Sequence, residues 1–282
     1  MLATEYVYEP ANYQEAISDP DYAIEWKKAI QAELNSLEQN ETWTMEDLPV
    51  GRKPVRSKWV FKVKYRDDGT IEKFKGRVVA QGFSQVYGVD YEETFAPTVR
   101  YDILRLLFAI TAIEDLEMHQ MDVISTYLAG DLNEEIYMHP PEGYDTGEGK
   151  YCHLRKSIYG LKQAARVWNR LLTEFLEKLG FSKFHADHSV LSNGNVIIAI
   201  YVDDMLLFGR LLKDIETVKA FIRAKFQAKD LGEAKVCLRV CITRDQKNRT
   251  LRIDQSAYAR NILRRFQAEN LTSISMPMET SA

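Results

Sequence analysis

The stretch Val196–Phe208, VIIAIYVDDMLLF, decides the fold prediction because two adjacent carboxylates interrupt an otherwise apolar run. The flanking segments, Val196–Ile200 and Met205–Phe208, are typical of buried strands, so we expect Asp203 and Asp204 at a tight turn between two strands. Burying two unpaired carboxylates costs on the order of several kcal/mol. A divalent cation removes that cost, because Mg²⁺ prefers one or two carboxylates together with water and phosphate oxygens.

A third carboxylate, Asp122, also stands at the end of an apolar segment, within Met121-Asp122-Val123. Three carboxylates at the ends of two neighbouring strands can hold two metal ions ~3.5–4 Å apart, the arrangement of two-metal nucleotidyl transfer. Simpler alternatives stay open at this point. Asp203 and Asp204 fit a solvated acidic hairpin turn, and Asp122 fits a strand-end cap.

Composition places the chain among ordinary globular proteins. Its 282 residues allow one large domain or two smaller ones, and 45% hydrophobic with 28% charged residues excludes a wholly disordered chain. Three scattered cysteines exclude a secreted disulfide scaffold and fit a reducing compartment. No apolar run reaches the ~18 residues of a membrane span, and the first residues lack signal-peptide character. We therefore expect an intracellular protein without a membrane partner.

The charge distribution points to a polyanionic partner although the net charge is only -4. Residues 51–82 carry ten basic and three acidic side chains, and residues 150–170 carry six basic and no acidic ones. Residues 1–50 hold eleven acids and two bases. Two concentrated basic stretches in an acidic chain predict one electropositive wall. Two separate solvated Lys-rich faces explain the same pattern equally well.

The remaining pattern predicts an α+β fold with an antiparallel sheet, because strands and helices mix without regular βαβ spacing. Asn193-Gly194 between two apolar runs is a hairpin signal, and Asp67-Asp68-Gly69 is a turn signal. Gly180 ends a long helix. Helices are expected at 22–39, 97–113, 160–179, 212–228 and 256–267, and strands at 58–65, 71–81, 134–139, 189–191, 196–202, 236–243 and 250–254.

Ordered motifs over about residues 24–268 give the chain a family resemblance. They are NETW at 40–43, KWVFK at 58–62, KGRVVAQG at 75–82, YEETFAP at 91–97, QMDV at 120–123, SIYGLKQAARVWN at 157–169, YVDDM at 201–205 and KDLGE at 229–233. Together they resemble the reverse transcriptase of copia-type long-terminal-repeat retrotransposons. Each motif alone is weak, but the ordered set is specific.

The resemblance implies roles for individual residues. Asp122, Asp203 and Asp204 match the catalytic, metal-binding aspartates, which implies two Mg²⁺ ions, with Mn²⁺ as a substitute. Lys75 and Arg77 match basic residues that approach the incoming triphosphate, Tyr127 matches an aromatic that excludes the ribose 2′-hydroxyl, and Gln163 matches a polar residue near the nucleotide. Leu238 and Arg239 fall in the primer grip. Taken without the family, Lys75 and Arg77 read as solvated strand charges, Tyr127 as a buried aromatic and Gln163 as a surface residue.

The resemblance also implies a right-hand polymerase core with an antiparallel palm sheet backed by helices. We expect a loose N-terminal arm over 1–21, an N-terminal helix and fingers over 22–115, a palm over 116–235 that includes helix 160–179, and a primer grip with a partial, truncated thumb over 236–282. The implied partners are an RNA or DNA template with its primer and deoxynucleoside triphosphates. A cytoplasmic, nuclear or virus-like-particle location and an origin in a longer polyprotein follow from the same family.

Several positions depart from the family pattern, and Arg239 is the most serious because the family has glycine there. Glycine permits positive φ and leaves room for a nucleic-acid backbone. The implied reaction is templated addition of deoxynucleotides to a primer 3′-hydroxyl. Two alternatives stay open: a degenerate retrotransposon remnant that binds nucleic acid without catalysis, and another two-metal palm enzyme such as a cyclase.

Overall fold

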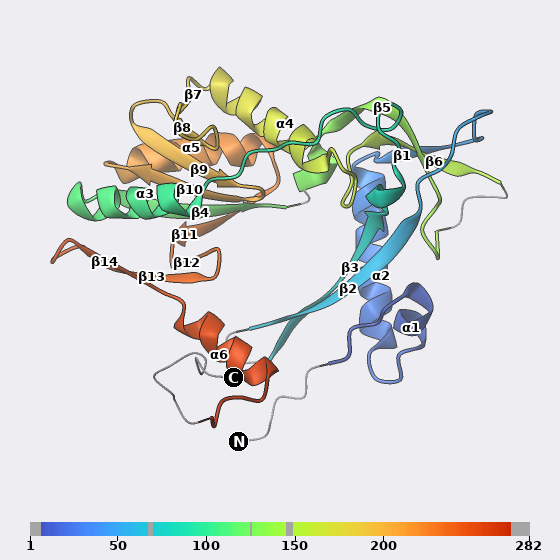
Figure 1. Cartoon of the computed structure of the whole chain (residues 1–282), viewed down its shortest axis with the longest axis horizontal. Helices are drawn as coiled ribbons and strands as arrows, with labels where there is room; N and C mark the ends of the chain where they lie inside the picture. Colours follow the sequence, from blue (N-terminus) through green and yellow to red (C-terminus); the bar gives the residue numbers. More distant parts are fainter. Residues whose placement is uncertain (1–6, 67–69, 125, 145–148, 272–282) are drawn as a thin grey trace, which may run out of the picture. The chain divides into compact units, whose positions relative to one another are not determined.

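The computed structural model describes residues 7–66, 70–124, 126–144 and 149–271. The chain divides into two compact units, each drawn in Figure 1. The first unit comprises 1–98 and 123–182, and the second comprises 99–122 and 183–282. Strand pairs whose register is defined within the described residues are antiparallel, as the α+β prediction requires.

A two-stranded ribbon and a helix form half of the first unit. The ribbon pairs β2 (Ser57–Tyr65) with β3 (Ile71–Ala80), and α2 (Ala23–Gln39) packs against it. Trp26 of α2 meets Phe61 and Phe74 edge-on, with ring centroids 5.3 and 4.7 Å apart. Such aromatic burial supplies much of the apolar driving force of this unit.

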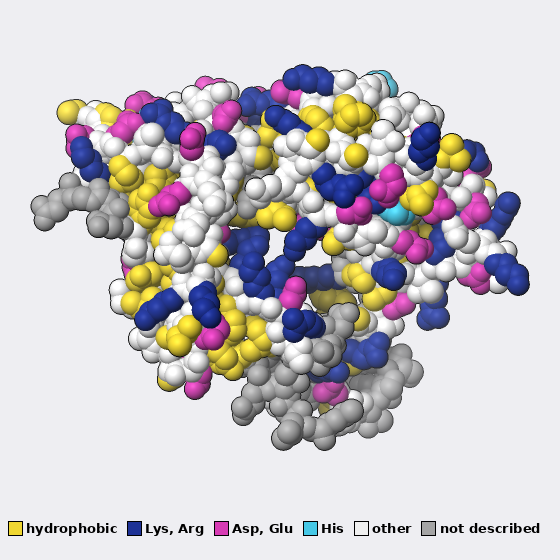
Figure 2. All heavy atoms as spheres, turned by 180° about the vertical axis from the view of Figure 1, so that it is seen from behind, with side chains coloured by type: hydrophobic (Ala, Val, Ile, Leu, Met, Phe, Trp, Pro, Cys, Tyr) yellow, Lys and Arg dark blue, Asp and Glu magenta, His cyan; other side chains and the backbone are white. Residues whose placement is uncertain are grey.

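The opposite face of the ribbon is basic, because side chains alternate across a strand. The antiparallel register brings Lys62 opposite Lys75 and Lys64 opposite Lys73, while Arg77 lies opposite Val60. In Figure 2 dark blue Lys and Arg side chains gather where this ribbon lies. The alternation read from residues 58–65 is therefore confirmed, with apolar residues on one face and cations on the other.

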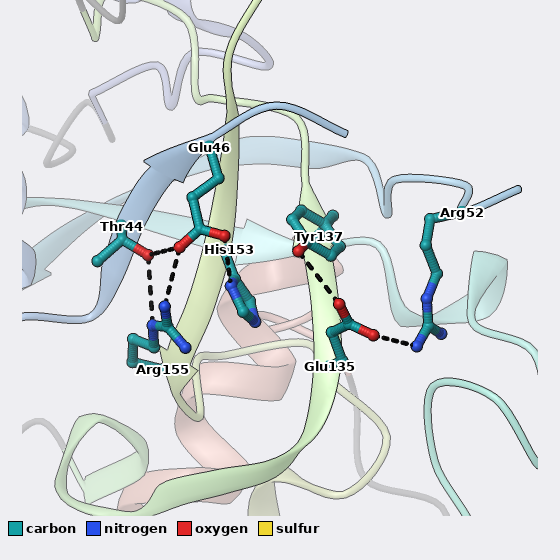
Figure 3. A network of polar contacts seen from close by, with 7 residues as sticks. All are labelled: Thr44, Glu46, Arg52, Glu135, Tyr137, His153 and Arg155. Atoms are coloured by element: carbon teal, nitrogen blue, oxygen red, sulfur yellow. Dashed lines mark hydrogen bonds and ion pairs between the residues drawn. The ribbon is translucent and has the colours of Figure 1, made fainter. Parts of the chain in front are cut away.

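A three-stranded sheet completes the first unit, in the order β1 (Trp43–Glu46), β6 (Tyr151–Lys156), β5 (Asp131–Met138). Polar side chains of this sheet form the network of Figure 3, in which the His153 ring stacks on Tyr137 with centroids 4.6 Å apart. Cross-strand pairs of this kind stabilise sheets. The other members of the network are Thr44, Glu46, Arg52, Glu135 and Arg155. The unit also contains η1 (Gly82–Ser84), η2 (Thr126–Ala129) and α4 (Ala164–Lys178).

A six-stranded sheet dominates the second unit. Its order is β11-β4-β10-β9-β8-β7, with β4 (Glu117–Val123), β7 (Ser182–Lys183), β8 (Val190–Ser192), β9 (Val196–Tyr201), β10 (Asp204–Gly209) and β11 (Ala228–Glu233). Helix α5 (Leu212–Lys225) contacts β10 and β11. The central strands β9 and β10 are almost entirely buried, as their unbroken apolar sequence requires.

Lys219 of α5 is a buried cation that links this helix to strands β4 and β11 of the sheet. Its ammonium lies 2.7 Å from a carboxylate oxygen of Asp230 on β11 and 2.6 Å from one of Glu216. It also lies 2.9 Å from Nδ1 of His119 on β4. A buried charge needs such partners to offset its desolvation. The network therefore fixes β4, the strand that carries Asp122, against α5 and β11.

A second, smaller sheet lies in the same unit, with the order β12 (Val236–Cys237), β13 (Val240–Asp245), β14 (Thr250–Asp254). It packs with α3 (Tyr101–Ile113) around a shared apolar cluster that includes Leu104, Phe108 and Ile242. Helix α6 (Ser256–Arg265) follows and has no buried residue.

Some predicted boundaries differ from the structure for identifiable reasons. The helix predicted from Pro97 begins at Tyr101, and the helix predicted from 160 begins at Ala164, because Gly160 has φ +90° and cannot continue a helix. The predicted strand 236–243 is instead the hairpin β12–β13. Within the expected arm, α1 (Tyr13–Ser18) buries Ala16 completely, so that its described part is packed rather than loose. The predicted turn at 67–69 lies outside the described residues.

No helix among the described residues is both long and apolar enough to span a bilayer.

Candidate active site

The strands β4 and β10 bring two of the three predicted aspartates together. They pair antiparallel, with Asp122 directly opposite Asp204. Side chains directly opposite on neighbouring strands share a face and have Cβ atoms ~4.5–5.5 Å apart. The prediction that Asp122 and the acidic pair lie at neighbouring strand ends is confirmed by this register.

Asp203 occupies the turn between β9 and β10. Tyr201 pairs with Asp204, so Val202 and Asp203 form a two-residue hairpin connection. Val202 has φ +57°, a conformation that is rare for a β-branched residue and costs on the order of 1–3 kcal/mol. Buried strands on both sides over-determine this turn, which is how a fold keeps a strained residue in place.

The pKa of Asp204 responds to burial and to the charges of the other two aspartates. Burial raises the pKa of Asp204 above its usual value, and the charges of Asp203 and Asp122 raise it further. Gln120 opposes this by donating a hydrogen bond from Nε2 to Oδ1 of Asp204 at 3.1 Å. A cation at this point would relieve the repulsion, because it lowers the free energy of the ionised form.

The side chains as they lie do not form a complete metal site. Within the described ranges, no three His, Cys, Asp or Glu side chains converge closely enough to hold an ion. The Asp204 carboxylate is turned toward Gln120, from which its Oδ1 accepts a hydrogen bond. The backbone juxtaposition of the aspartates is thus established, whereas the expected convergence of their carboxylates is not met in this arrangement.

Three of the predicted nucleotide-site residues lie together in the first unit. The guanidinium of Arg77 lies over the ring of Tyr159, 4.1 Å from its centroid, and Tyr127 meets that ring edge-on at 4.8 Å. Lys75 is half-buried near Arg77 on β3. Burial, together with the charges of Arg77 and Lys64, lowers the pKa of Lys75 to about 8. Sequence reasoning missed Tyr159, although it belongs to the SIYGLKQ motif.

Gln163, the fourth predicted nucleotide-site residue, is buried rather than on the surface. Its Nε2 donates to the carbonyl oxygen of Asp90 at 2.9 Å, and its Oε1 accepts from Nε2 of Gln85 at 3.1 Å. Gln85 Oε1 in turn accepts from the backbone N–H of Lys162 at 2.8 Å. Gln163 therefore fixes the loop 82–91 against the start of α4 in this conformation.

The predicted primer-grip residues form the two-residue turn between β12 and β13. Leu238 has φ +49° and Arg239 has φ +66°, so both residues are in the left-handed region. The Tyr101 hydroxyl donates to the carbonyl oxygen of Leu238 at 3.3 Å, and the Arg239 guanidinium lies 5.2 Å from the ring centroid of Tyr258 on α6. The expectation that glycine suits this position better than Arg239 is consistent with its positive φ.

The described geometry is an antiparallel pair of strands that places Asp122 opposite Asp204, beside a turn that contains Asp203. The family described as reverse transcriptase (RNA-dependent DNA polymerase) matches residues 40–280, and the chain belongs to this family.

Within that family the chain is similar to copia-type polyproteins, which confirms the resemblance inferred from the motifs. It is 37% identical to the retrovirus-related Pol polyprotein from transposon TNT 1-94 of Nicotiana tabacum, over 98% of this chain and 22% of the relative. It is 32% identical to that from transposon RE2 of Arabidopsis thaliana, over 97% of this chain and 20% of the relative. The chain thus spans about a fifth of the length of these curated relatives.

Proposed function

We propose that this chain is the catalytic core of an RNA-directed DNA polymerase, which adds deoxynucleotides to a primer 3′-hydroxyl on an RNA or DNA template. The observation that carries the proposal is the register of Asp122 opposite Asp204, with Asp203 in the adjoining turn. The family membership supports the same reaction. A copia-type Pol polyprotein is the proposed parent of the chain, because its relatives carry that name.

The proposed metal ligands are Asp122, Asp203 and Asp204, whose hard carboxylate oxygens suit Mg²⁺ or Mn²⁺. Two bound Mg²⁺ ions would activate the primer hydroxyl and neutralise the leaving pyrophosphate. The aspartates position the cations at the ends of two strands that the sheet holds in register.

The first unit supplies the proposed nucleotide contacts. Lys75 and Arg77 offer cations to the triphosphate, and Tyr127, braced by Tyr159, offers the ring that excludes a ribose 2′-hydroxyl. Gln163 acts by holding the loop 82–91. In the proposed right-hand arrangement, residues 22–115 form the N-terminal helix and fingers, 116–235 the palm, and 236–282 the primer grip and partial thumb.

The basic segments 51–82 and 150–170 are the proposed contacts to the nucleic-acid backbone. They meet within the first unit, where the N–H of Ala80 donates to the carbonyl oxygen of Tyr159 at 2.8 Å. Lys and Arg contacts to phosphate release counterions, so that binding should weaken steeply with salt. An affinity for primer–template that stays flat between low and moderate salt would contradict this part of the proposal.

Primer extension tests the proposed reaction. With Mg²⁺ and a homopolymeric RNA template, Asp203→Asn should lower the single-turnover rate by at least about a hundredfold, because a metal ligand is lost while the turn keeps its shape. The matched control is Asp102→Asn, an exposed carboxylate on α3, which should extend the primer like the parent chain. Equal rates for the parent and Asp203→Asn would refute the metal role.

A second candidate function, a folded remnant that binds nucleic acid without catalysis, is favoured by one observation. Arg239 takes φ +66° at a position where the family has glycine, and its side chain is turned to Tyr258. This candidate predicts salt-dependent binding with no extension by the parent chain. Measurable extension by the parent chain would exclude it.

A further inference from the structure

Four cations share the basic face of the β2–β3 ribbon, and we call them the ribbon cation cluster: Lys64, Lys73, Lys75 and Arg77. Lys64 lies directly opposite Lys73, and Lys75 and Arg77 follow at alternate positions of β3, so the four side chains lie on one face. Within the residues that the structure describes, none of the four forms an ion pair, whereas Lys62 of the same ribbon pairs with Glu9. The cluster therefore attracts anions.

Lys75 differs from the other lysines of the cluster because its side chain is half-buried, whereas Lys64 and Lys73 are exposed. Among the described residues, no hydrogen bond engages its ammonium. Burial, followed by the charges of Arg77 and Lys64, lowers the pKa of Lys75 to about 8. Desolvation beside other cations is the setting that makes a lysine amine a nucleophile near neutral pH.

The lower basicity of Lys75 leaves a net gain in reactivity. At pH 8 its free-amine fraction exceeds that of a lysine with the ordinary pKa by about a hundredfold. A less basic nucleophile attacks more slowly, and a Brønsted slope of ~0.4–0.5, as for thiols, makes this loss about tenfold. Lys75 should therefore react with electrophiles about tenfold faster than an ordinary exposed lysine.

Arg77 provides an anion contact in the same cluster. Its guanidinium lies over the ring of Tyr159, 4.1 Å from the centroid. A guanidinium that stacks on a ring keeps N–H donors at its edge, where they match phosphate oxygens in a bidentate arrangement. Lys64 and Lys73 add long-range attraction for the same anion. The cluster therefore suits an electrophile that carries a phosphate group.

We propose that Lys75 is an acylation site for acyl phosphates, which the ribbon cation cluster recruits by their phosphate group. The Lys75 nitrogen attacks the acyl carbon and forms an amide bond, while the bond from that carbon to the phosphate oxygen breaks. Inorganic phosphate leaves with the electron pair of that bond, and the nitrogen loses one proton to water. The step needs no oxidant and no further reactant.

Acylation replaces a cation by a neutral amide, so it removes one charge from the cluster at a position proposed above to meet the nucleotide triphosphate. The acylated chain should therefore bind a triphosphate more weakly. This consequence rests on the proposed function, whereas the covalent step itself does not, and the step is tested without a polymerase assay.

Site-resolved peptide mass spectrometry of the full chain, after incubation with acetyl phosphate at pH 8, tests the proposal. We expect Lys75 to be acetylated at least about fivefold faster than Lys58, an exposed lysine of β2. Inorganic phosphate, added at constant ionic strength, should slow this acetylation of Lys75 by about threefold or more, because it competes for the cluster. Acetylation by N-acetylimidazole, which carries no phosphate, should not respond to inorganic phosphate.

Arg77→Gln should slow the acetylation of Lys75 by acetyl phosphate by about fivefold or more, because both recruitment and reactivity fall. The matched control is Lys28→Gln, which removes one exposed cation from α2, the helix on the opposite face of the ribbon, and should leave the rate unchanged. A Lys75 rate no higher than that of Lys58 would overturn the proposal. So would a Lys75 rate that neither inorganic phosphate nor Arg77→Gln lowers, or an equal loss in Lys28→Gln.

Discussion

Two hairpin turns of the second unit, Val202-Asp203 and Leu238-Arg239, have the same length and different chemistry. Both join antiparallel strands through two residues, and both contain a non-glycine residue with positive φ. The first turn joins two buried strands of the six-stranded sheet, whereas the second joins a two-residue strand to a half-exposed one. Backbone strain at positive φ is therefore supported by buried strands at the first turn and by short, partly exposed strands at the second.

The comparison indicates where each turn's conformation comes from. Central strands on both sides impose the conformation of Val202, and the strain serves to present Asp203 beside Asp204. At the second turn, Tyr101 donates a hydrogen bond to the carbonyl oxygen of Leu238, and the Tyr258 ring contacts the Arg239 guanidinium. By the motif resemblance alone, Asp203 and Asp204 at the first turn match the family, whereas Arg239 at the second stands where glycine is expected.

The largest expected effect concerns catalysis at the second turn. Arg239→Gly should raise the single-turnover extension rate by between tenfold and about a hundredfold, because a misplacement of ~1 Å at the primer terminus costs about 10²-fold. Binding of primer–template should change much less. Arg249→Gly is the matched control, since Arg249 also has positive φ, at +52°, in the same small sheet. Similar rates for the parent, Arg239→Gly and Arg249→Gly would mean that Arg239 does not limit extension.

An intermediate effect concerns the stability of the first turn as pH changes. Asp204 has a raised folded pKa, so the folded state binds more protons than the unfolded state above the ordinary Asp pKa, and stability falls as pH rises through that window. Asp204→Asn removes this loss and should raise the free energy of unfolding at pH 7 without divalent cations. Urea unfolding at pH 4 and pH 7 measures it. A variant less stable than the parent at pH 7 would contradict the repulsion described here.

The smallest expected effect compares the strain of the two turns directly. Val202→Gly relieves about 1–3 kcal/mol of strain and loses about 0.5–1 kcal/mol to unfolded-state entropy, so it should stabilise the chain by about 1 kcal/mol. Arg239→Gly also loses a cation–π contact of about 0.5–1 kcal/mol, so its net change should be close to zero. Thermal unfolding of both variants, with Arg249→Gly alongside, ranks the three turns; a larger gain at Arg239 would reverse the comparison.

The first turn was predictable from the residue pattern, whereas at the second only the family resemblance implied a turn, for a physical reason. The turn in Val196–Phe208 can be predicted from the residues of that segment alone, because an acidic pair inside an apolar run fits few structures other than a turn between buried strands. Leu238-Arg239 contains none of the Gly, Asn or Asp residues that signal a hairpin, so the pattern predicted a continuous strand. The conformation there depends on Tyr101 and Tyr258, which are distant in sequence.

Long-range partners also explain why the alternative interpretation of Gln163, as a surface residue of a helix taken without the family, is wrong. A single glutamine in a helical pattern has no local reason to be buried. Gln85 and Asp90, more than seventy residues earlier, complete its hydrogen bonds and so offset the desolvation cost of burying its amide. The basic and apolar faces of β2 and β3 needed no such partner, because strand alternation alone separates them.

The ribbon of β2 and β3 has two open edges, and carboxylates occupy both. The N–H of Val63 on one edge donates to Glu9 at 3.0 Å, and the N–H of Val78 on the other donates to Glu33 at 3.1 Å. Unpaired edge amides are the usual template for intermolecular strand addition and fibril growth. A foreign strand joining at either amide would have to displace a charge-assisted hydrogen bond and approach a carboxylate, so these two amides are not available to pair with another chain.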